Sequence, residues 1–407
     1  MTAKSPGLRP EIDALLRPDL RGQSPYGAPQ LDVPVALNTN ENSYPVPDVV
    51  VESITAAVRA VATGLNRYPD REFTELREAL AAYLSRSATA VGADQVWAGN
   101  GSNEVLLHLL QAFGGPGRTA LGFTPAYSMH PIITRTTGTR WVDGMRGVRG
   151  PDGSDRGRPF DLDAAGAEAQ VREHAPDVVF LCSPNNPTGT ALGLDVVEAV
   201  HDAAPEALVV VDEAYAEFAR PGTPSALTLL AGRPRLVVTR TMSKAFALAG
   251  ARLGYLAADP SVTDALRLVR MPYHLGTQTQ AVALAALAHT DLMLATVGAI
   301  KDQRDRIVAA LPSLGLVPVP SDANFVLFGL LPDSAATWRA LLDRGVLVRD
   351  VGIAHYLRVT AGTEAETTAF LDALTLVLDH GADPQTSART RAHTSPQTSR
   401  HTSRETA

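Results

Sequence analysis

The chain has 407 residues, and 45% of them are hydrophobic, so it is long enough to bury a large core, which we expect to be divided between two lobes. The formal net charge of −7 argues against nucleic acid as the main partner, because a phosphate backbone selects basic surfaces. The single cysteine, Cys182, excludes an internal disulfide and favours a reducing, cytoplasmic environment, where we expect it to be a small core residue.

The first 35 residues are expected to form an arm that lies over another surface, because they contain six prolines. Residues 1–22 mix charges of both signs and have no apolar core, so they are not a signal peptide. Residues 36–275 are predicted to form a large domain in which short apolar strands alternate with helical patterns. Such alternation is typical of an α/β fold with a mostly parallel sheet covered by helices.

A glycine-flanked polar segment, G-N-G-S-N-E at residues 99–104, precedes an apolar pattern. Leu106, Leu109 and Phe113 recur at helical spacing, which places the polar residues at the N-terminus of a helix. Exposed backbone N–H groups and the helix dipole favour a bound phosphate there. An ordinary capping loop is the alternative interpretation.

Four apolar runs predict buried strands, and polar residues follow each of them: 119–123, 178–182, 208–211 and 236–241. In open α/β sheets, ligands bind outside the carboxyl ends of the strands. The polar residues that follow these runs are therefore candidates for a binding site.

Tyr127, Asn186 and Tyr215 follow the first three runs and are candidates for contacts with an aromatic ligand. Tyr127 would stack on its face, and Asn186 is held in a rigid turn by the prolines of S-P-N-N-P-T-G. Asp212, in D-E-A-Y, would supply the anion that keeps a pyridine nitrogen protonated, with Tyr215 within reach of a phenolic oxygen. A core tyrosine, a plain turn and a helix cap are the corresponding alternatives.

Lys244 follows the fourth run, in T-M-S-K, and Arg252 comes eight residues later. An amine forms a Schiff base with a carbonyl, whereas the hydroxyls of Thr241 and Ser243 and a guanidinium bind phosphate. This set suits a phosphate-bearing aldehyde that is held covalently. A solvated lysine and a surface arginine are the alternative.

The rest of the chain is predicted to form a smaller α+β domain, residues 276–380, with strands near 316–319, 324–328, 346–348 and 356–360. Its most apolar stretch, 281–300, is interrupted by a histidine and an aspartate, and we interpret it as a buried helix or helix pair rather than a membrane span. Residues 381–407 are rich in Ser, Thr, Arg, His and Pro and are expected to be disordered, while residues 144–160 are expected to form a mobile surface loop. No H-x-x-x-H or C-x-x-C spacing occurs, so no metal site is predicted.

In this order, the segments resemble those of the fold-type I pyridoxal-phosphate aminotransferases, and within them the histidinol-phosphate aminotransferases. The resemblance covers about residues 20–375, and Ser43 departs from the pattern, in which a proline usually follows N-E-N. The matching stretches are L-N-T-N-E-N (37–42), R-Y-P-D (67–70), G-N-G-S-N-E (99–104), S-P-N-N-P-T-G (183–189), D-E-A-Y (212–215), T-M-S-K-A-F-A-L-A-G-A-R-L-G-Y (241–255), L-V-R-D (347–350) and L-R-V-T (357–360).

The resemblance implies a role for each candidate residue. Lys244 would form the Schiff base with the cofactor, pyridoxal 5′-phosphate, and act as the proton shuttle. Asp212 would pair with the ring nitrogen of the cofactor, and Tyr215 and Asn186 would contact its ring oxygen. Tyr127 would stack on the ring, and the cofactor phosphate would be bound by Ser102, Asn103, Thr241, Ser243 and Arg252.

Substrate recognition and assembly are implied in the same way. Arg358 would anchor the carboxylate of glutamate, and the phosphate of the amino substrate would be recognised by Arg349, Tyr26 and Asn40. Tyr68, in R-Y-P-D, would reach the phosphate of the other subunit's cofactor, which implies a homodimer with shared active sites.

The implied function is transamination in histidine biosynthesis, in which L-histidinol phosphate and 2-oxoglutarate are interconverted with imidazole-acetol phosphate and L-glutamate. Three other classes stay open. An aromatic amino-acid aminotransferase shares nearly every residue above. A pyridoxal-phosphate-dependent amino-acid-phosphate decarboxylase shares the cofactor set but cleaves a different bond at Cα. A binding protein or regulator with this fold would not need both Lys244 and Asp212. No nucleic-acid or membrane partner is expected.

Overall fold

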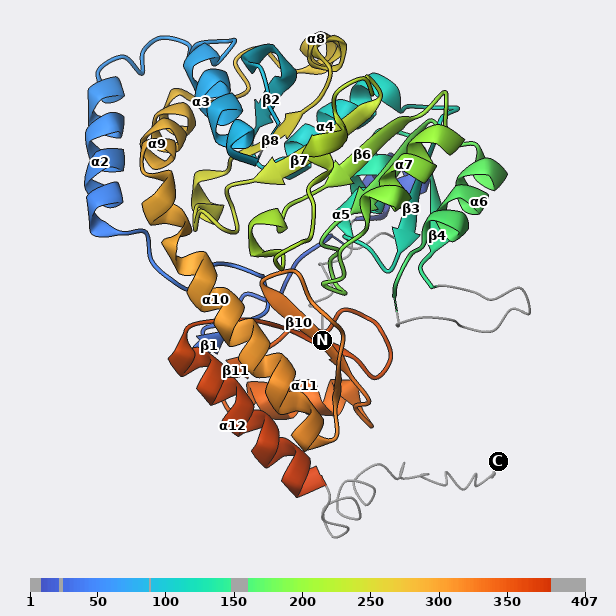
Figure 1. Cartoon of the computed structure of the whole chain (residues 1–407), viewed down its shortest axis with the longest axis vertical. Helices are drawn as coiled ribbons and strands as arrows, with labels where there is room; N and C mark the ends of the chain where they lie inside the picture. The colour runs from blue at the N-terminus through green and yellow to red at the C-terminus, as the bar shows by residue number, and fades with distance from the viewer. Residues whose placement is uncertain (1–8, 22–24, 88, 148–159, 382–407) are drawn as a thin grey trace, which may run out of the picture.

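The computed structural model describes residues 9–21, 25–87, 89–147 and 160–381 (Figure 1). Most of the loop predicted at residues 144–160 lies outside the described residues, and so does the predicted tail beyond Gly381.

A seven-stranded sheet forms the centre of the upper part of the molecule (Figure 1). Only β8 runs antiparallel to its neighbours, and the other strands share one direction. In spatial order the strands are β2 (Val96–Gly99), β8 (Gly254–Ala257), β7 (Leu236–Thr241), β6 (Leu208–Asp212), β5 (Val178–Cys182), β3 (Thr119–Thr124) and β4 (Arg140–Met145). The four strands predicted from apolar runs are confirmed, and so is the α/β class with a mostly parallel sheet.

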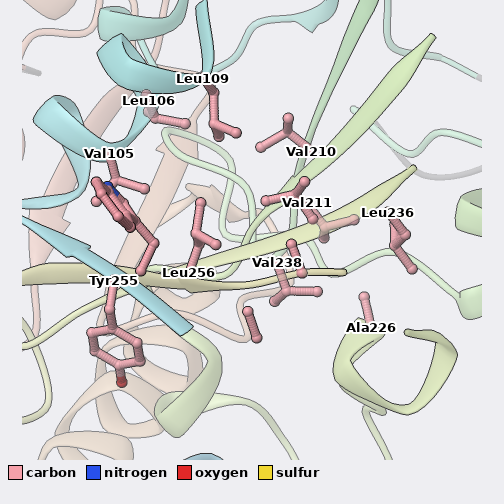
Figure 2. Packing of buried hydrophobic residues seen from close by; sticks show 14 of the residues in the cluster. Val105, Leu106, Leu109, Val210, Val211, Ala226, Leu236, Val238, Tyr255 and Leu256 are labelled. Atoms are coloured by element: carbon pink, nitrogen blue, oxygen red, sulfur yellow. The ribbon is translucent and has the colours of Figure 1, made fainter. Parts of the chain in front are cut away.

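Helices cover this sheet because its central strands are buried along their whole length, as continuous apolar runs require. Figure 2 shows side chains of the predicted phosphate helix, α4, gathered with valines and leucines of the strands in one cluster. The helices of this part are α2 (Asp48–Ala62), α3 (Thr74–Leu84), α4 (Ser102–Phe113), α5 (Met129–Thr136), α6 (Ala164–His174), α7 (Leu194–Ala203), α8 (Pro260–Val269) and α9 (Thr277–Ala288).

Two small sheets lie in the lower part of Figure 1, and their residues contribute to a second apolar cluster. One sheet has the antiparallel order β12-β10-β9, and the other pairs β1 with β11 in parallel. The four strands predicted near 316–319, 324–328, 346–348 and 356–360 are confirmed, whereas β1 was not predicted. The elements are β1 (Val35–Ala36), β9 (Val317–Pro318), β10 (Phe325–Gly329), β11 (Val346–Leu347), β12 (Leu357–Thr360), α10 (Thr290–Ala310), α11 (Ser334–Leu342) and α12 (Glu364–Gly381).

The apolar stretch 281–300 forms parts of two helices, α9 and α10, which meet at His289 with a bend of 75°. Within the described residues, no single helix is both long and apolar enough to cross a membrane, and only this bent pair reaches that length and composition together. The helix-pair interpretation is therefore confirmed.

The domain boundaries remain a proposal, which the packing refines. Ala283 and Ala286 of α9 belong to the cluster of the large sheet, whereas Leu37 belongs to the second cluster. We propose that the large lobe extends through α9 and that the segment around β1 belongs to the small lobe. The proline-rich arm before it is mostly exposed where it is described, and contains a short helix, α1 (Pro10–Asp13).

Gly254 allows the N-terminus of α4 to lie directly on the sheet. A Cβ at this position would be 2.0 Å from the backbone nitrogen of Ser102, where no flexible side chain can move aside. We expect Gly254→Ala to destabilise the protein by about 1–3 kcal/mol, measured as the free energy of unfolding.

Gly298→Ala in α10 is the matched control, because its Cβ would meet nothing within 4 Å. Alanine in a helix interior is favoured over glycine by about 0.8–1 kcal/mol, so this control should be neutral or stabilising. Equal effects of the two substitutions would contradict the close packing inferred for Gly254.

Candidate active site

A cavity of about 520 Å³ lies at the carboxyl ends of the parallel strands. Every candidate site residue except Tyr68 lines it, although the segments that supply them are spread from the N-terminal arm to β12. The residues brought together are Tyr26, Asn40, Ser102, Asn103, Tyr127, Asn186, Asp212, Tyr215, Thr241, Ser243, Lys244, Arg252, Arg349 and Arg358.

Lys244 lies in the loop that follows β7, and its Nζ donates a hydrogen bond to the carbonyl oxygen of Thr39 at 3.1 Å. Burial of the amine, together with the nearby guanidinium of Arg358, lowers the pKa of Lys244 to about 8, although Glu41 opposes the shift. A larger fraction of this amine is therefore neutral near physiological pH than in an ordinary lysine. The neutral amine is the form that attacks a carbonyl.

Asp212 ends β6 and is 1% exposed. One of its carboxylate oxygens lies 3.0 Å from Nε2 of His130, and the other accepts a hydrogen bond from the hydroxyl of Thr239 at 3.3 Å. A buried carboxylate is costly unless it is hydrogen-bonded or paired with a cation. Asp212 has these two contacts and also lines the cavity, where a ligand could supply the cation. The alternative of a helix cap is wrong, because Tyr215 is the residue that precedes the next short helix.

His130 is a site residue that the sequence reasoning missed. It lies on α5 and stacks on Phe180, with ring centroids 4.8 Å apart, which fixes the imidazole under Asp212. Its place three residues after Tyr127, in the segment that follows β3, was the available signal. Nothing in the sequence near either residue indicates that His130 contacts Asp212.

The hydroxyl of Tyr215 accepts hydrogen bonds from two side-chain amides. Nδ2 of Asn40 donates to it at 3.0 Å and Nδ2 of Asn186 at 3.4 Å. Burial raises the pKa of Tyr215 to about 12, so the hydroxyl keeps its proton. With its oxygen accepting from these amides, the hydroxyl proton is free to be donated to a ligand oxygen. Asn40 thus contacts Tyr215, besides lining the cavity as predicted for a substrate contact.

A cradle of donors surrounds the N-terminus of α4. Gly101 has φ +83°, and a Cβ there would lie 2.5 Å from Nη2 of Arg252, so only glycine leaves room for the guanidinium. The hydroxyls of Thr241 and Ser243 are 3.0 Å apart, and Tyr127 donates from its hydroxyl to Oδ1 of Asn103 at 3.2 Å. A helix N-terminus, two hydroxyls and a guanidinium fit a phosphate ester.

Arg349 and Arg358 are adjacent across an antiparallel bridge, with two backbone hydrogen bonds of 2.9 Å. Arg358 donates to Oδ1 of Asn186 at 2.5 Å and to the carbonyl oxygen of Asn38 at 2.8 Å, while its buried Nε has no partner among the described residues. Burial lowers the pKa of Arg358 to about 10. The guanidinium of Arg349 lies 6.0 Å from the ring centroid of Tyr26.

Neither arginine has a carboxylate partner among the ion pairs of residues 9–21, 25–87, 89–147 and 160–381. Two guanidinium groups that line one cavity without forming an ion pair in the described part of the chain can bind the anionic groups of a substrate.

Tyr68 does not line this cavity. It is 79% exposed and stacks on Tyr273, with ring centroids 4.4 Å apart. Its predicted role requires a second subunit and stays a prediction.

Comparison with known proteins places these features in one family. Residues 33–374 match the family model of aminotransferase class I and II. The chain is 64% identical to the histidinol-phosphate aminotransferase of Paenarthrobacter aurescens over 89% of its own length and 95% of that protein, and 59% identical to that of Thermobifida fusca over 89% and 95%.

Solved structures agree with this assignment. The histidinol-phosphate aminotransferase of Sinorhizobium meliloti in complex with pyridoxal-5′-phosphate has a TM-score of 0.73 and 27% identity, covering 86% of this chain and 92% of that one. A mutant aspartate aminotransferase of Thermus thermophilus has the same TM-score of 0.73, with 26% identity over 89% and 99% of the two chains. The chain therefore belongs to the aminotransferase class I and II family and, within it, to the histidinol-phosphate aminotransferases.

Proposed function

We propose that the chain is a pyridoxal-phosphate-dependent transaminase of histidine biosynthesis, which interconverts L-histidinol phosphate and 2-oxoglutarate with imidazole-acetol phosphate and L-glutamate. The observation that carries this proposal is the cavity in which Lys244, Asp212 and two arginines without carboxylate partners converge. The 64% identity to a protein of that name supports the choice of substrate. It also favours this function over the aromatic aminotransferase and the decarboxylase.

The residues present fit the cofactor. When bound, pyridoxal phosphate supplies an aldehyde that combines with amines and a protonated ring that withdraws electrons from the substrate Cα. Asp212 would hold the ring nitrogen in its protonated form, with His130 fixing the carboxylate from below. Tyr215 and Asn186 would bind the ring oxygen, and Tyr127 would cover the ring face. The phosphate would be bound by Ser102, Asn103, Thr241, Ser243 and Arg252.

Lys244 would perform the chemical work of the protein. Its amine would hold the aldehyde of the cofactor, and in its neutral form it would be placed to accept and return the proton of the substrate Cα. General acid–base catalysis of this kind contributes about 10²–10⁴-fold to the rate. The lowered pKa of Lys244 suits this role, because a base works best when its pKa is near the operating pH.

One site must accept two anionic substrates in turn. Arg358, which is buried and held by Asn186 and the backbone of Asn38, would anchor the carboxylate of glutamate. Tyr26 belongs to the proline-rich arm, and Arg349 lies 6.0 Å from its ring; these two residues would bind the phosphate of histidinol phosphate.

We also propose a homodimer located in the cytoplasm. Tyr68 and its stacking partner Tyr273 are exposed, together with Met271 at 73%. The outer helix α2 adds exposed valines at positions 49 and 51 (Figure 1). An apolar surface of this kind is typical of a contact between subunits, and it would carry Tyr68 to the partner's cofactor phosphate. The single buried cysteine fits a reducing compartment.

The pKa of Lys244 predicts how cofactor capture depends on pH. As the pH rises through about 8, the neutral fraction of the amine rises, so the rate of covalent capture by the cofactor-free enzyme should increase and then level off. Arg358→Gln should move the inflection to higher pH, because it removes a cation that lowers this pKa. Stopped-flow absorbance after mixing with pyridoxal phosphate measures the rate.

Lys244→Ala is the control for this experiment. It should bind the cofactor without forming an adduct that borohydride can reduce, and it should keep the fold. A reducible adduct in that variant would show that another amine reacts.

Substitution of Asp212 is predicted to lower turnover more than substitution of His130. Asp212→Asn should keep the cofactor but lose most turnover, because an amide does not stabilise the protonated ring nitrogen. His130→Phe removes only a contact of the carboxylate, so we expect a smaller loss, about 10- to 150-fold, from a hydrogen bond to a charged group worth about 1.5–3 kcal/mol. Single-turnover rates with glutamate measure both. Near wild-type turnover of Asp212→Asn would remove Asp212 from the mechanism.

The two arginines are predicted to divide the substrates. Arg358→Ala should weaken both half-reactions, because it anchors the carboxylate of glutamate and supports Asn186. Arg349→Ala, and more mildly Tyr26→Phe, should raise KM for histidinol phosphate more than for glutamate, by about 10- to 150-fold for a lost charge-assisted contact. Steady-state kinetics of each half-reaction test this division. If Arg349→Ala lowers kcat/KM equally for phenylpyruvate and imidazole-acetol phosphate, the aromatic aminotransferase is favoured instead.

A further inference from the structure

The cavity contains a carboxylate that the roles above do not use. Among the described residues that line it, the acids are Glu41, Asp212 and Asp350. Asp212 contacts His130 and is the residue proposed to hold the ring nitrogen of the cofactor. Asp350 accepts the backbone N–H of Gly352 at 2.9 Å, in a local turn. Glu41 is exposed and lines the cavity, and among the described residues its carboxylate accepts a hydrogen bond only from the hydroxyl of Thr39, at 2.8 Å.

The charge of Glu41 raises the pKa of Lys244, but Glu41 is not paired with a cation of the site among the described residues. In the part of the chain that the structure describes, no ion pair includes Glu41, although Lys244, Arg252, Arg349 and Arg358 line the same cavity. A carboxylate left free beside four cations is unexpected in a site whose substrates are anions. It has the right chemistry for a part of the substrate that donates a hydrogen bond.

The backbone holds Glu41 in place on both sides. Asn40 has φ +56°, and its N–H donates to the hydroxyl of Thr360 at 3.1 Å, while Nδ2 of Asn324 donates to its carbonyl oxygen at 3.1 Å. On the other side, Nδ2 of Asn42 donates to the hydroxyl of Thr296 at 3.1 Å. The carboxylate is therefore presented from a fixed segment rather than from a free loop.

This fixed segment also contacts the reacting amine. Thr39 accepts the hydrogen bond of Lys244 through its carbonyl oxygen and donates to Glu41 through its hydroxyl. Thr39 therefore links the amine of Lys244, where the substrate amine must arrive, to the carboxylate of Glu41. We expect a side chain attached to the substrate Cα to lie near this carboxylate.

We propose that the Glu41 carboxylate accepts a hydrogen bond from the imidazole N–H of the substrate, and so selects an imidazole over a phenyl side chain. This inference rests on the proposed function. The imidazole ring carries an N–H donor whether it is neutral or protonated, whereas a phenyl ring has no donor. A phenyl ring placed against Glu41 would remove water from the carboxylate and return no hydrogen bond, and sites of this kind discriminate strongly against the analogue without the donor.

The test is the specificity ratio of Glu41→Ala, defined as kcat/KM for histidinol phosphate divided by kcat/KM for phenylalanine, each with 2-oxoglutarate as acceptor. The ratio should fall by about 10- to 150-fold, the value of one hydrogen bond to a charged group. The loss for histidinol phosphate should also exceed the loss in the glutamate half-reaction. Equal losses for all three substrates would overturn the proposal, because they would show that Glu41 acts on Lys244 or on the fold.

Two variants make the result specific to Glu41. Glu41→Gln keeps the size of the side chain and one acceptor oxygen, so its specificity ratio should fall less than that of Glu41→Ala. If the alanine variant does not fold, the fall measured in Glu41→Gln is the test. Asp350→Asn changes another carboxylate of the same cavity and should keep a ratio close to that of the wild type. A fall in the ratio as large in Asp350→Asn as in Glu41→Ala would also overturn the proposal.

The wild-type enzyme separates this proposal from the function on which it rests. If the wild type does not turn over histidinol phosphate, the proposed function fails and the selection by Glu41 falls with it. If the wild type prefers histidinol phosphate to phenylalanine and Glu41→Ala keeps the same ratio, only the role of Glu41 is overturned.

Discussion

The site depends on charged side chains that the protein buries without neutralising them. Lys244 and Arg358 are enclosed in one cavity, and burial lowers the pKa of each. Burying an ion without a partner is costly, and the cost is recovered when a ligand of opposite charge or a carbonyl arrives. Elsewhere in the molecule, the buried guanidinium of Arg240 is paired, with the carboxylate of Glu213 at 2.8 Å.

The alternation of side chains along the strands separates these two kinds of site. Asp212 and Glu213 are consecutive, but one contacts His130 and the other contacts Arg240. At the same strand end, Glu213 therefore forms a buried ion pair, whereas the carboxylate of Asp212 lines the cavity. Glycines at positions 101 and 254 complete the arrangement, because each leaves space that the cradle or the helix N-terminus occupies.

Local patterns in the sequence predict the strands and the residues at their ends, since apolar runs and turn residues are properties of a few consecutive positions. Strand β7 begins at Leu236 and β6 at Leu208, as the apolar runs predict. Contacts between distant segments could not be predicted in this way. The pairing of His130 with Asp212 and the free carboxylate of Glu41 depend on how separate segments meet. The division between the lobes also depends on packing, which places side chains of α9 in the apolar cluster of the large sheet.

The most direct test of the proposed function is turnover of the purified protein, loaded with pyridoxal phosphate and glutamate, with three acceptor conditions. These are imidazole-acetol phosphate, phenylpyruvate and no acceptor. We expect 2-oxoglutarate to form fastest with imidazole-acetol phosphate, because Arg349 and Tyr26 are placed to bind its phosphate. Faster turnover with phenylpyruvate would contradict the proposed function and identify an aromatic aminotransferase.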